Sequence, residues 1–391
     1  MKIKINNRIT EKIKSVSLIR NLSGTLNMAL TGPMASGREI YPDDINKLRD
    51  DAVKLKEMMA KADDDHLELD KAMLMVIILD LLKPVMRGEE MWADIMGAVE
   101  DESMIFDAGE YAENPYYKNI KFDDKVSGDF KLTHSSYRPY EIFVYDCPVR
   151  YGDTLIDIPR IGCFDKTFEF PSITEKGDAW MSVTPNEVMT MKNQIAEAHG
   201  RVLTLGLGMG YYTYMASLKD DVESVTVIER EQSVIDLFDT YILPQFEHRE
   251  KIHIIKADAV EYMKNLTDGV YDYCFADIWQ GLDDMDTYFA VKEVSRRRFT
   301  HMKMSYWIEN SYIYALLSSV CLDILFTFYE TSGIPAPSLD KMRDSERRQL
   351  EYIKKLLADE EINRPEHIDY YMNPVTLLNL IENTDIRYNL L

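Results

Sequence analysis

Cysteine is scarce in this sequence of 391 residues, and the few cysteines present show no pairing pattern. The four lie far apart, without a CxxC unit or zinc-ligand spacing: Cys147, Cys163, Cys274 and Cys321. Neither a disulfide framework nor a structural zinc site is therefore expected. The pattern is typical of reduced, packed thiols in a cytoplasmic protein, and no metal site is predicted.

The sequence also has fewer basic than acidic residues, and it has few long apolar runs. The 45 Lys and Arg face 67 Asp and Glu, and the net charge of −22 disfavours non-specific nucleic-acid binding. Residues 72–79 are too few to cross a membrane, and residues 312–329 carry Asp323 and two serines. Both runs therefore predict buried helices, not membrane spans. No apolar segment typical of a signal peptide follows the first charged residues.

The length predicts two to three domains, and four regions differ in residue pattern. Residues 1–115 predict helices, with a helical hairpin over residues 43–58 and 67–82. Residues 116–183 hold short β-rich segments separated by Gly and Pro, a pattern typical of antiparallel hairpins. Residues 184–330 alternate strand and helix, whereas residues 331–391 predict helices alone.

The alternating region predicts a parallel sheet with helices on both faces. Its five apolar segments are the expected strands: residues 202–207, 224–229, 252–257, 271–277 and 305–309. Before the first strand, Thr184-Pro185-Asn186-Glu187 predicts a helix start with a capping box. Capping explains Glu187, and a position of Asn186 and Glu187 at a pocket is the alternative.

The strongest chemical signal is the turn that contains Gly206, Gly208 and Gly210, between the first strand and its helix. Without Cβ atoms, these residues let the backbone turn sharply and let a ligand lie against it. Glu229 closes the second strand, where a carboxylate can accept hydrogen bonds from the ribose hydroxyls of an adenosine ligand. The strand, turn, helix and acidic residue together predict a nucleoside site.

The G-x-G-x-G spacing differs from the dinucleotide fingerprint, because Tyr211 stands where that fingerprint has its third glycine. It resembles the first motif of class I S-adenosylmethionine-dependent methyltransferases. Asp258-Ala259 resembles that family's contact with the adenine amino group, and Asp277 resembles the acidic residue beside its reacting centre. The resemblance implies an α/β, Rossmann-like sheet of strand order 3-2-1-4-5, preceded by a small β-region and flanked by helical N- and C-terminal extensions.

Residues 120–310 resemble the spermidine synthase-like branch of this superfamily, which also places a small β-domain before the glycine strand. Spermidine synthases carry Asp-Ser-Ser-Asp after the fourth strand. Here Asp277 is followed by Ile278-Trp279-Gln280-Gly281, so the second aspartate is missing. Trp279 either stacks on the adenine or substrate, or closes the core.

The sequence thus predicts an S-adenosylmethionine-dependent transferase, with a methyltransferase of a small-molecule substrate as the first hypothesis. Asp277 is the expected catalytic residue, because it can orient or deprotonate a nucleophile. A spermidine synthase-like aminopropyltransferase and a non-catalytic cofactor-binding module are the alternatives, and a homo-oligomer is also compatible. The cofactor contacts are expected from the glycine turn and the strand ends: Gly206, Gly208, Gly210, Glu229, Asp258, Ala259, Asp277 and Trp279.

Overall fold

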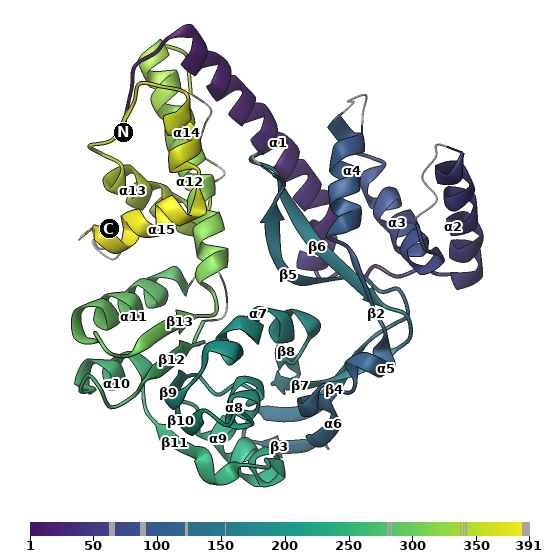
Figure 1. Ribbon diagram of the computed structural model, residues 1–391, viewed down its shortest axis with the longest axis vertical. Coiled ribbons are helices and arrows are strands. Elements are labelled where there is room, and N and C mark those ends of the chain that lie inside the picture. The colour runs from purple at the N-terminus through teal and green to yellow at the C-terminus, as the bar shows by residue number, and fades with distance from the viewer. Residues whose placement is uncertain are drawn as a thin grey trace.

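The computed structural model describes residues 1–61, 67–86, 91–121, 124–152, 154–279, 281, 284–336, 338, 340 and 342–384. Figure 1 shows a parallel sheet with its helices in the lower part of the molecule and two groups of helices above it. The long helix α1 (Asn7–Ala35) extends between these two groups, and packs on both α3 (Leu69–Leu82) and α12 (Glu309–Ser332).

The N-terminal helices form where polar caps precede apolar runs. The Asn6 side chain accepts a hydrogen bond from the N–H of Ile9 at the start of α1, and Asp44 caps α2 (Ile45–Ala60) in the same way. The predicted helical hairpin is present as α2 and α3, which pack into one apolar cluster. Three further helices complete this region: α4 (Met91–Asp101), α5 (Ala108–Tyr111) and α6 (Pro115–Asn119).

Two small sheets follow these helices. The antiparallel sheet has the order β3-β4-β7-β8, from β3 (Lys125–Ser127), β4 (Phe130–Tyr137), β7 (Phe168–Glu175) and β8 (Asp178–Ser182). The other joins β5 (Phe143–Arg150) and β6 (Asp157–Phe164) to β2 (Met104–Phe106). The strand β2 lies in the region predicted to be helical, and it pairs in parallel with β6. Three residues are too few for a recognisable alternating pattern.

The central sheet is parallel throughout, and its strands lie in the order β11-β10-β9-β12-β13, which is 3-2-1-4-5 along the chain. They are β9 (Gly200–Leu205), β10 (Val222–Glu229), β11 (Ile252–Lys256), β12 (Tyr273–Ala276) and β13 (Lys303–Tyr306). The first strand, β9, lies between two neighbours and is not an edge strand. This arrangement brings the carboxyl ends of β9, β10 and β12 to one edge of the sheet.

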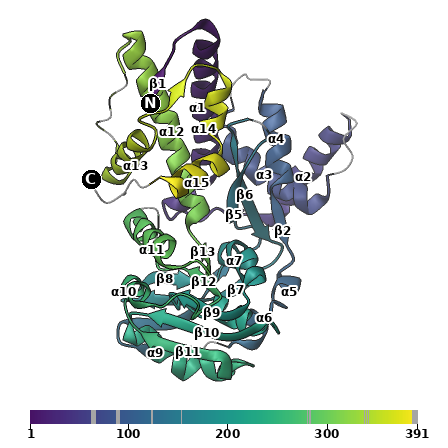
Figure 2. The ribbon, with the colours of Figure 1, turned by 60° about the vertical axis from the view of Figure 1, so that its left-hand side comes forward.

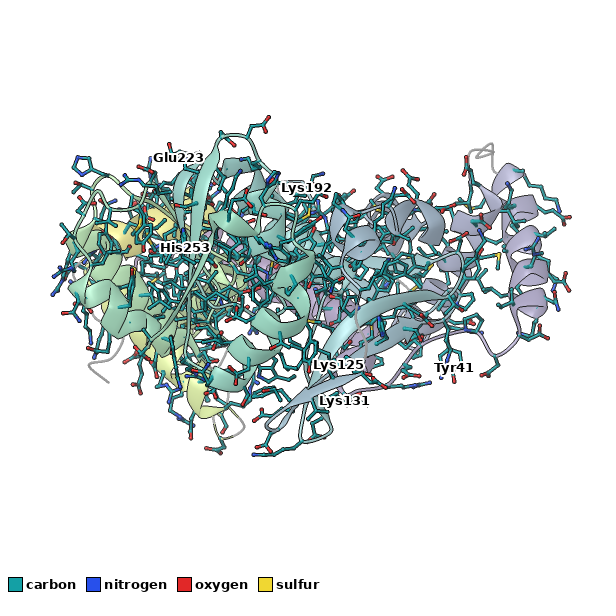
Figure 3. All side chains as sticks on the ribbon, turned by 90° about the horizontal axis from the view of Figure 1, so that it is seen from below. Tyr41, Lys125, Lys131, Lys192, Glu223 and His253 are labelled. Atoms are coloured by element: carbon teal, nitrogen blue, oxygen red, sulfur yellow. The ribbon has the colours of Figure 1, made fainter. Side chains whose placement is uncertain are left out.

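Helices cover both faces of this sheet, which makes it the middle of three layers. One face packs against α7 (Pro185–Glu197), α8 (Tyr211–Ser217) and α9 (Gln232–Leu237). The other packs against α10 (Ala259–Asn265) and α11 (Met285–Arg298). Figure 3 shows polar side chains on the outside of these layers, including Lys192 on α7, Glu223 on β10 and His253 on β11.

Two predicted elements differ in the structure. The fifth strand was expected over residues 305–309 but spans Lys303–Tyr306. It ends earlier than predicted because Ile308 is apolar for packing in the core and not for strand pairing. The helix that the alternation predicts after the second strand ends with α9, and the chain continues as a π-turn (Phe238–Ile242) and a 3₁₀ turn (Leu243–Gln245). Pro244 lies in the 3₁₀ turn, where it cannot donate the hydrogen bond of a continuing helix. Another 3₁₀ turn, Arg249–Lys251, precedes β11.

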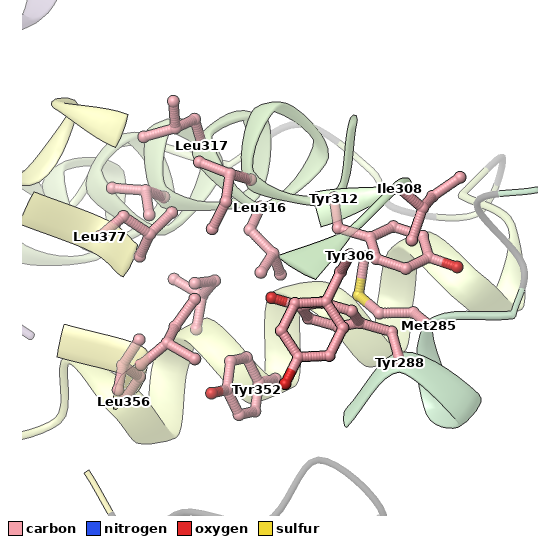
Figure 4. Close-up of a cluster of buried hydrophobic side chains, with 14 of the residues drawn as sticks. Met285, Tyr288, Tyr306, Ile308, Tyr312, Leu316, Leu317, Tyr352, Leu356 and Leu377 are labelled. Atoms are coloured by element: carbon pink, nitrogen blue, oxygen red, sulfur yellow. The ribbon is translucent and has the colours of Figure 1, made fainter. Parts of the chain in front are cut away.

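The C-terminal part packs α12 against α13 (Asp344–Leu356), α14 (Glu366–Tyr371) and α15 (Pro374–Asn383). The expectation of helices alone was wrong, since β14 (Glu361–Ile362) pairs in parallel with β1 (Lys2–Ile3). Figure 4 shows the shared core, in which Tyr288 of α11 and Tyr306 of β13 meet Leu316 of α12 and Tyr352 of α13. The C-terminal helices therefore continue one face of the central sheet.

Among the described residues, α12 is the one helix long and apolar enough to cross a membrane. Its buried residues include Tyr312, Leu316, Val320 and Ile324, which belong to the same core cluster as the sheet residues. Figure 2 shows α12 between α1 and α13. This packing agrees with the sequence-based expectation of a buried helix.

Candidate functional site

The turn between β9 and α8 needs glycine for two separate reasons. Gly206, Gly208 and Gly210 all have positive φ, at +97°, +51° and +75°, where side chains are disfavoured. In addition, a Cβ on Gly206 would lie 2.0 Å from the carbonyl oxygen of Asp277. The turn therefore approaches the end of β12 more closely than any other residue type would allow.

The β-region and α6 lie directly against this turn. A Cβ on Gly208 would lie 2.5 Å from the sulfur of Met181 on β8. The hydroxyl of Tyr116 on α6 donates to the carbonyl of Met209, and the Asn114 amide lies 3.2 Å from the Tyr211 hydroxyl. Local sequence patterns could not predict these contacts, because Met181 lies on a strand of a separate sheet and the hydrogen bonds of Tyr116 and Asn114 join residues 93 and 97 positions apart.

Glu229 is buried at the end of β10, with 9% of its surface exposed. Its carboxylate accepts hydrogen bonds from the N–H groups of Leu207 at 3.2 Å, Arg230 at 2.7 Å and Glu231 at 2.8 Å. Glu229 thus holds the glycine turn to the neighbouring strand. A carboxylate has about four acceptor positions, so capacity for a ligand hydroxyl remains.

Asp258 and Ala259 follow β11, one strand beyond Glu229. The Asp258 carboxylate is exposed and caps α10 by accepting the N–H of Glu261 at 2.9 Å, while Ala259 is buried beneath it. The backbone N–H of Ala257 donates to the Glu229 carbonyl at 3.0 Å. Asp258 therefore acts as a helix cap, and its second carboxylate oxygen is free of hydrogen bonds to described residues.

Asp277 follows β12, and a second carboxyl that the motif analysis had assigned to a helix cap lies beside it. This is Glu187, in the first turn of α7. Burial raises the pKa of both carboxyls, and the negative charge of Asp277 raises that of Glu187 further. Because the charge of Asp277 disfavours ionisation of Glu187, the two carboxyls titrate as a coupled pair.

The first turn of α7 is held in place by a chain of hydrogen bonds. The indole N–H of Trp307, just beyond β13, donates to the Thr190 hydroxyl at 2.8 Å. That hydroxyl donates to the Asn186 carbonyl at 2.6 Å. Thr184 caps the helix, as predicted, by accepting the N–H of Glu187 at 3.5 Å. The Glu187 carboxyl also interacts electrostatically with Asp277, which raises its pKa, and local sequence could not distinguish this role from a capping box.

Trp279 packs into the core behind this edge of the sheet. Its ring lies 6.0 Å from Tyr288 and 6.4 Å from Tyr306, measured between centroids, and 6% of its surface is exposed. Its indole N–H is buried and has no hydrogen-bond partner among the described residues. The placement favours the core interpretation over stacking on a ligand. Gln280, in the same loop, lies outside the described residues.

In the part of the chain that the structure describes, no three His, Cys, Asp or Glu side chains are grouped in a way that could hold a metal ion.

The sequence matches no known family model and no curated protein. Among solved structures, it is similar to the spermidine synthase of Thermotoga maritima, with a TM-score of 0.26 and 15% identity over 37% of this chain and 58% of that chain. It is similar also to a precorrin-6y C5,15-methyltransferase of Geobacter metallireducens, with a TM-score of 0.23 and 17% identity over 30% of this chain and 59% of that one. This chain thus spans little more than half the length of either protein.

We predict that Gly206→Ala destabilises the protein far more than Gly269→Ala. Both glycines have positive φ, at +97° and +82°, but a Cβ on Gly269 would have no atom within 4 Å. Gly269→Ala should cost about 1–2 kcal/mol through backbone strain alone. In Gly206→Ala the clash with the Asp277 carbonyl adds to this strain, so the loss in free energy of unfolding should exceed about 3 kcal/mol. Urea unfolding of both variants measures the difference, and equal losses would contradict the close approach of the turn to β12.

We also predict that Glu187→Gln becomes more stabilising as the pH rises. A carboxyl whose folded pKa is raised above its usual value of 4.5 favours the folded state below that value, and this contribution is lost as the pH rises through the folded pKa. Glutamine stays neutral at every pH. Between pH 5 and pH 9, the free energy of unfolding of the variant should therefore rise relative to that of the wild type by on the order of 1 kcal/mol. Chemical denaturation at both pH values measures the gain.

The matched control for this experiment is Glu223→Gln, because Glu223 is exposed on β10 and makes no hydrogen bond to a described residue. Its effect on the free energy of unfolding should stay constant from pH 5 to pH 9. A pH-independent effect of Glu187→Gln as well would show that Glu187 and Asp277 do not form a pair.

Proposed function

We propose that this chain is an S-adenosylmethionine-dependent transferase that moves a methyl group to a small molecule. The observation that carries the proposal is the meeting of the glycine turn, Glu229 and Asp277 at the carboxyl edge of β9, β10 and β12. In the strand order 3-2-1-4-5, the chain reverses its direction of winding between β9 and β12. Doubly wound sheets bind their ligands at that switch point.

The residues at this edge fit an adenosine-containing cofactor. The glycine turn offers a backbone without side chains, and the thioether of Met181, whose flexible end can move, lies over Gly208. Glu229 keeps acceptor capacity for ribose hydroxyls, and Asp258 is available at the next strand for the adenine amino group. Trp279 has no direct part in this scheme. When bound, S-adenosylmethionine supplies an electrophilic methyl carbon on its sulfonium.

The Glu187–Asp277 pair supplies the acid–base chemistry. With one proton between them, the two carboxyls hold one negative charge that accepts a hydrogen bond from an amine or hydroxyl nucleophile. Because burial raises their pKa values toward neutrality, the pair is basic enough to take the proton that the nucleophile releases. Trp307 and Thr190 fix the helix that carries Glu187, which keeps the pair in position.

Aminopropyl transfer to an amine is the second candidate, and one observation favours it. The run after β12 lacks the second aspartate of the spermidine synthases, but Glu187 brings a second carboxyl to Asp277 from another element. Two carboxylates suit a cationic amine substrate, whose charge would lower the pKa of both.

Cofactor binding is tested by Glu229→Ala. Loss of the carboxylate should weaken S-adenosylhomocysteine binding by roughly 1–3 kcal/mol, the cost of leaving ribose hydroxyls without a charged acceptor. Calorimetry measures the affinity, with Glu223→Ala as the control at the opposite end of the same strand. Circular dichroism must show a folded variant, because Glu229 also holds Leu207. Unchanged affinity in the folded variant would remove Glu229 from the site.

Turnover is tested by Asp277→Asn. This variant should keep its affinity for S-adenosylhomocysteine but lose on the order of 100-fold or more in rate, since positioning and proton removal act on the reacting nucleophile. The assay offers labelled S-adenosylmethionine, or its decarboxylated form, with a panel of small amines and alcohols. Asp220→Asn, exposed at the opposite edge of the sheet, is the charge-matched control.

The outcomes of this assay separate the candidates. Transfer from S-adenosylmethionine supports the methyltransferase, and transfer from the decarboxylated form supports the aminopropyltransferase. Cofactor binding without transfer to any member of the panel would favour a non-catalytic binding module. Full activity of Asp277→Asn would show that Asp277 is structural.

A further inference from the structure

A second cavity lies between α1, α12 and α13, and no residue predicted for the cofactor site lines it. Its volume is about 580 Å³, within the usual range of small-molecule sites. Figure 2 shows these helices in the upper part of the molecule, above the central sheet. The cavity is therefore separate from the crevice at the strand ends.

The charged lining of this cavity has an excess of one positive charge, from two arginines and one glutamate: Arg20, Arg343 and Glu346. The guanidinium of Arg343 lies 3.1 Å from the Glu346 carboxylate, so these two charges are paired. Arg20 of α1 forms no hydrogen bond or ion pair with any described residue. The guanidinium of Arg20 therefore remains available to an anionic ligand in the cavity.

Polar groups without partners line the same cavity. Gln349 of α13 is 5% exposed and makes no side-chain hydrogen bond to a described residue. Ser319 of α12 is 4% exposed, and its hydroxyl also lacks such a partner. Neither residue is among those with a buried, unsatisfied polar atom, so the amide and the hydroxyl remain accessible and can form hydrogen bonds with a ligand in the cavity.

Another part of the lining is apolar. Leu322, Leu325 and Phe326 stand at helical spacing on one face of α12, and all three line the cavity. Only 56% of the most apolar segment of this helix is buried, and these residues are among those that remain partly exposed. The apolar excess of α12 is therefore explained in part by a cavity wall.

We propose that this cavity binds a small molecule with one negative charge on an apolar body, such as an aromatic carboxylate or sulfonate. Arg20 pairs with the anionic group, Ser319 and Gln349 hydrogen-bond to it or to a neighbouring polar atom, and Leu322, Leu325 and Phe326 contact the apolar body. A guanidinium binds such an anion through charge-assisted hydrogen bonds, which are stronger than neutral ones.

The probe for this site is anilinonaphthalene sulfonate, an aromatic monoanion whose fluorescence rises on binding. Titration of the full chain, with saturating S-adenosylhomocysteine present, should show one saturable site. Arg20→Gln should weaken that site by about tenfold or more, the effect of losing a charge-assisted hydrogen bond. Arg8→Gln is the matched control, because Arg8 is on the same helix, is exposed and does not line the cavity. The affinity of Arg8→Gln for anilinonaphthalene sulfonate should stay within about twofold of the wild-type affinity.

Ser319→Leu provides an independent test, since its larger side chain would fill the cavity and should abolish the saturable site. Circular dichroism melting identifies any variant that does not fold. The proposal is overturned by the absence of a saturable site in wild type, by wild-type affinity in folded Arg20→Gln and Ser319→Leu, or by an equal loss in Arg8→Gln. These results do not depend on whether S-adenosylhomocysteine binds, so they are distinguishable from failure of the proposed function.

Discussion

The close approach of Gly206 to the carbonyl of Asp277 is the constraint on which the candidate site depends. It requires β9 and β12 to be direct neighbours, and only a residue without a Cβ satisfies it. From that contact, the turn reaches across to Glu229 on one side, and the Asp277 side chain meets Glu187 on the other. One backbone contact therefore determines where the predicted cofactor residues and the Glu187–Asp277 pair can lie relative to one another.

Elements with a strong local pattern were predictable from the sequence. The apolar strands of the central sheet, the cap at Thr184 and the glycine turn each follow from spacing and backbone conformation over fewer than ten residues. Boundaries were less accurate, because burial extends beyond pairing, as at Ile308 after β13. The short strands β1, β2 and β14 had no detectable pattern, since their partners are distant in sequence and each has only two or three residues.

The candidate site was predictable only where one motif carried the information. Gly206, Glu229 and Asp277 were predicted as site residues because each stands at or just after the end of a recognisable strand, and the structure places all three at one edge of the sheet. Glu187 was seen but interpreted as a cap, since the same side chain can turn back to the helix start or across to Asp277, and only tertiary packing decides. Met181 and Tyr116 were missed, because their contacts with the glycine turn depend on how a separate β-region docks.

The pairing of β1 with β14 has a consequence for how the chain reaches its folded state. Residues 2–3 pair with residues 361–362, so this pairing cannot form until residue 362 has been synthesised. Closing such a long loop is slow, although its entropy cost grows only with the logarithm of its length. Before α12 and then β14 have been synthesised, Ile9, Ile13 and Val16 of α1 lack the apolar residues that these elements contribute to their shared core cluster. This stage of synthesis is where assistance from chaperones would matter most.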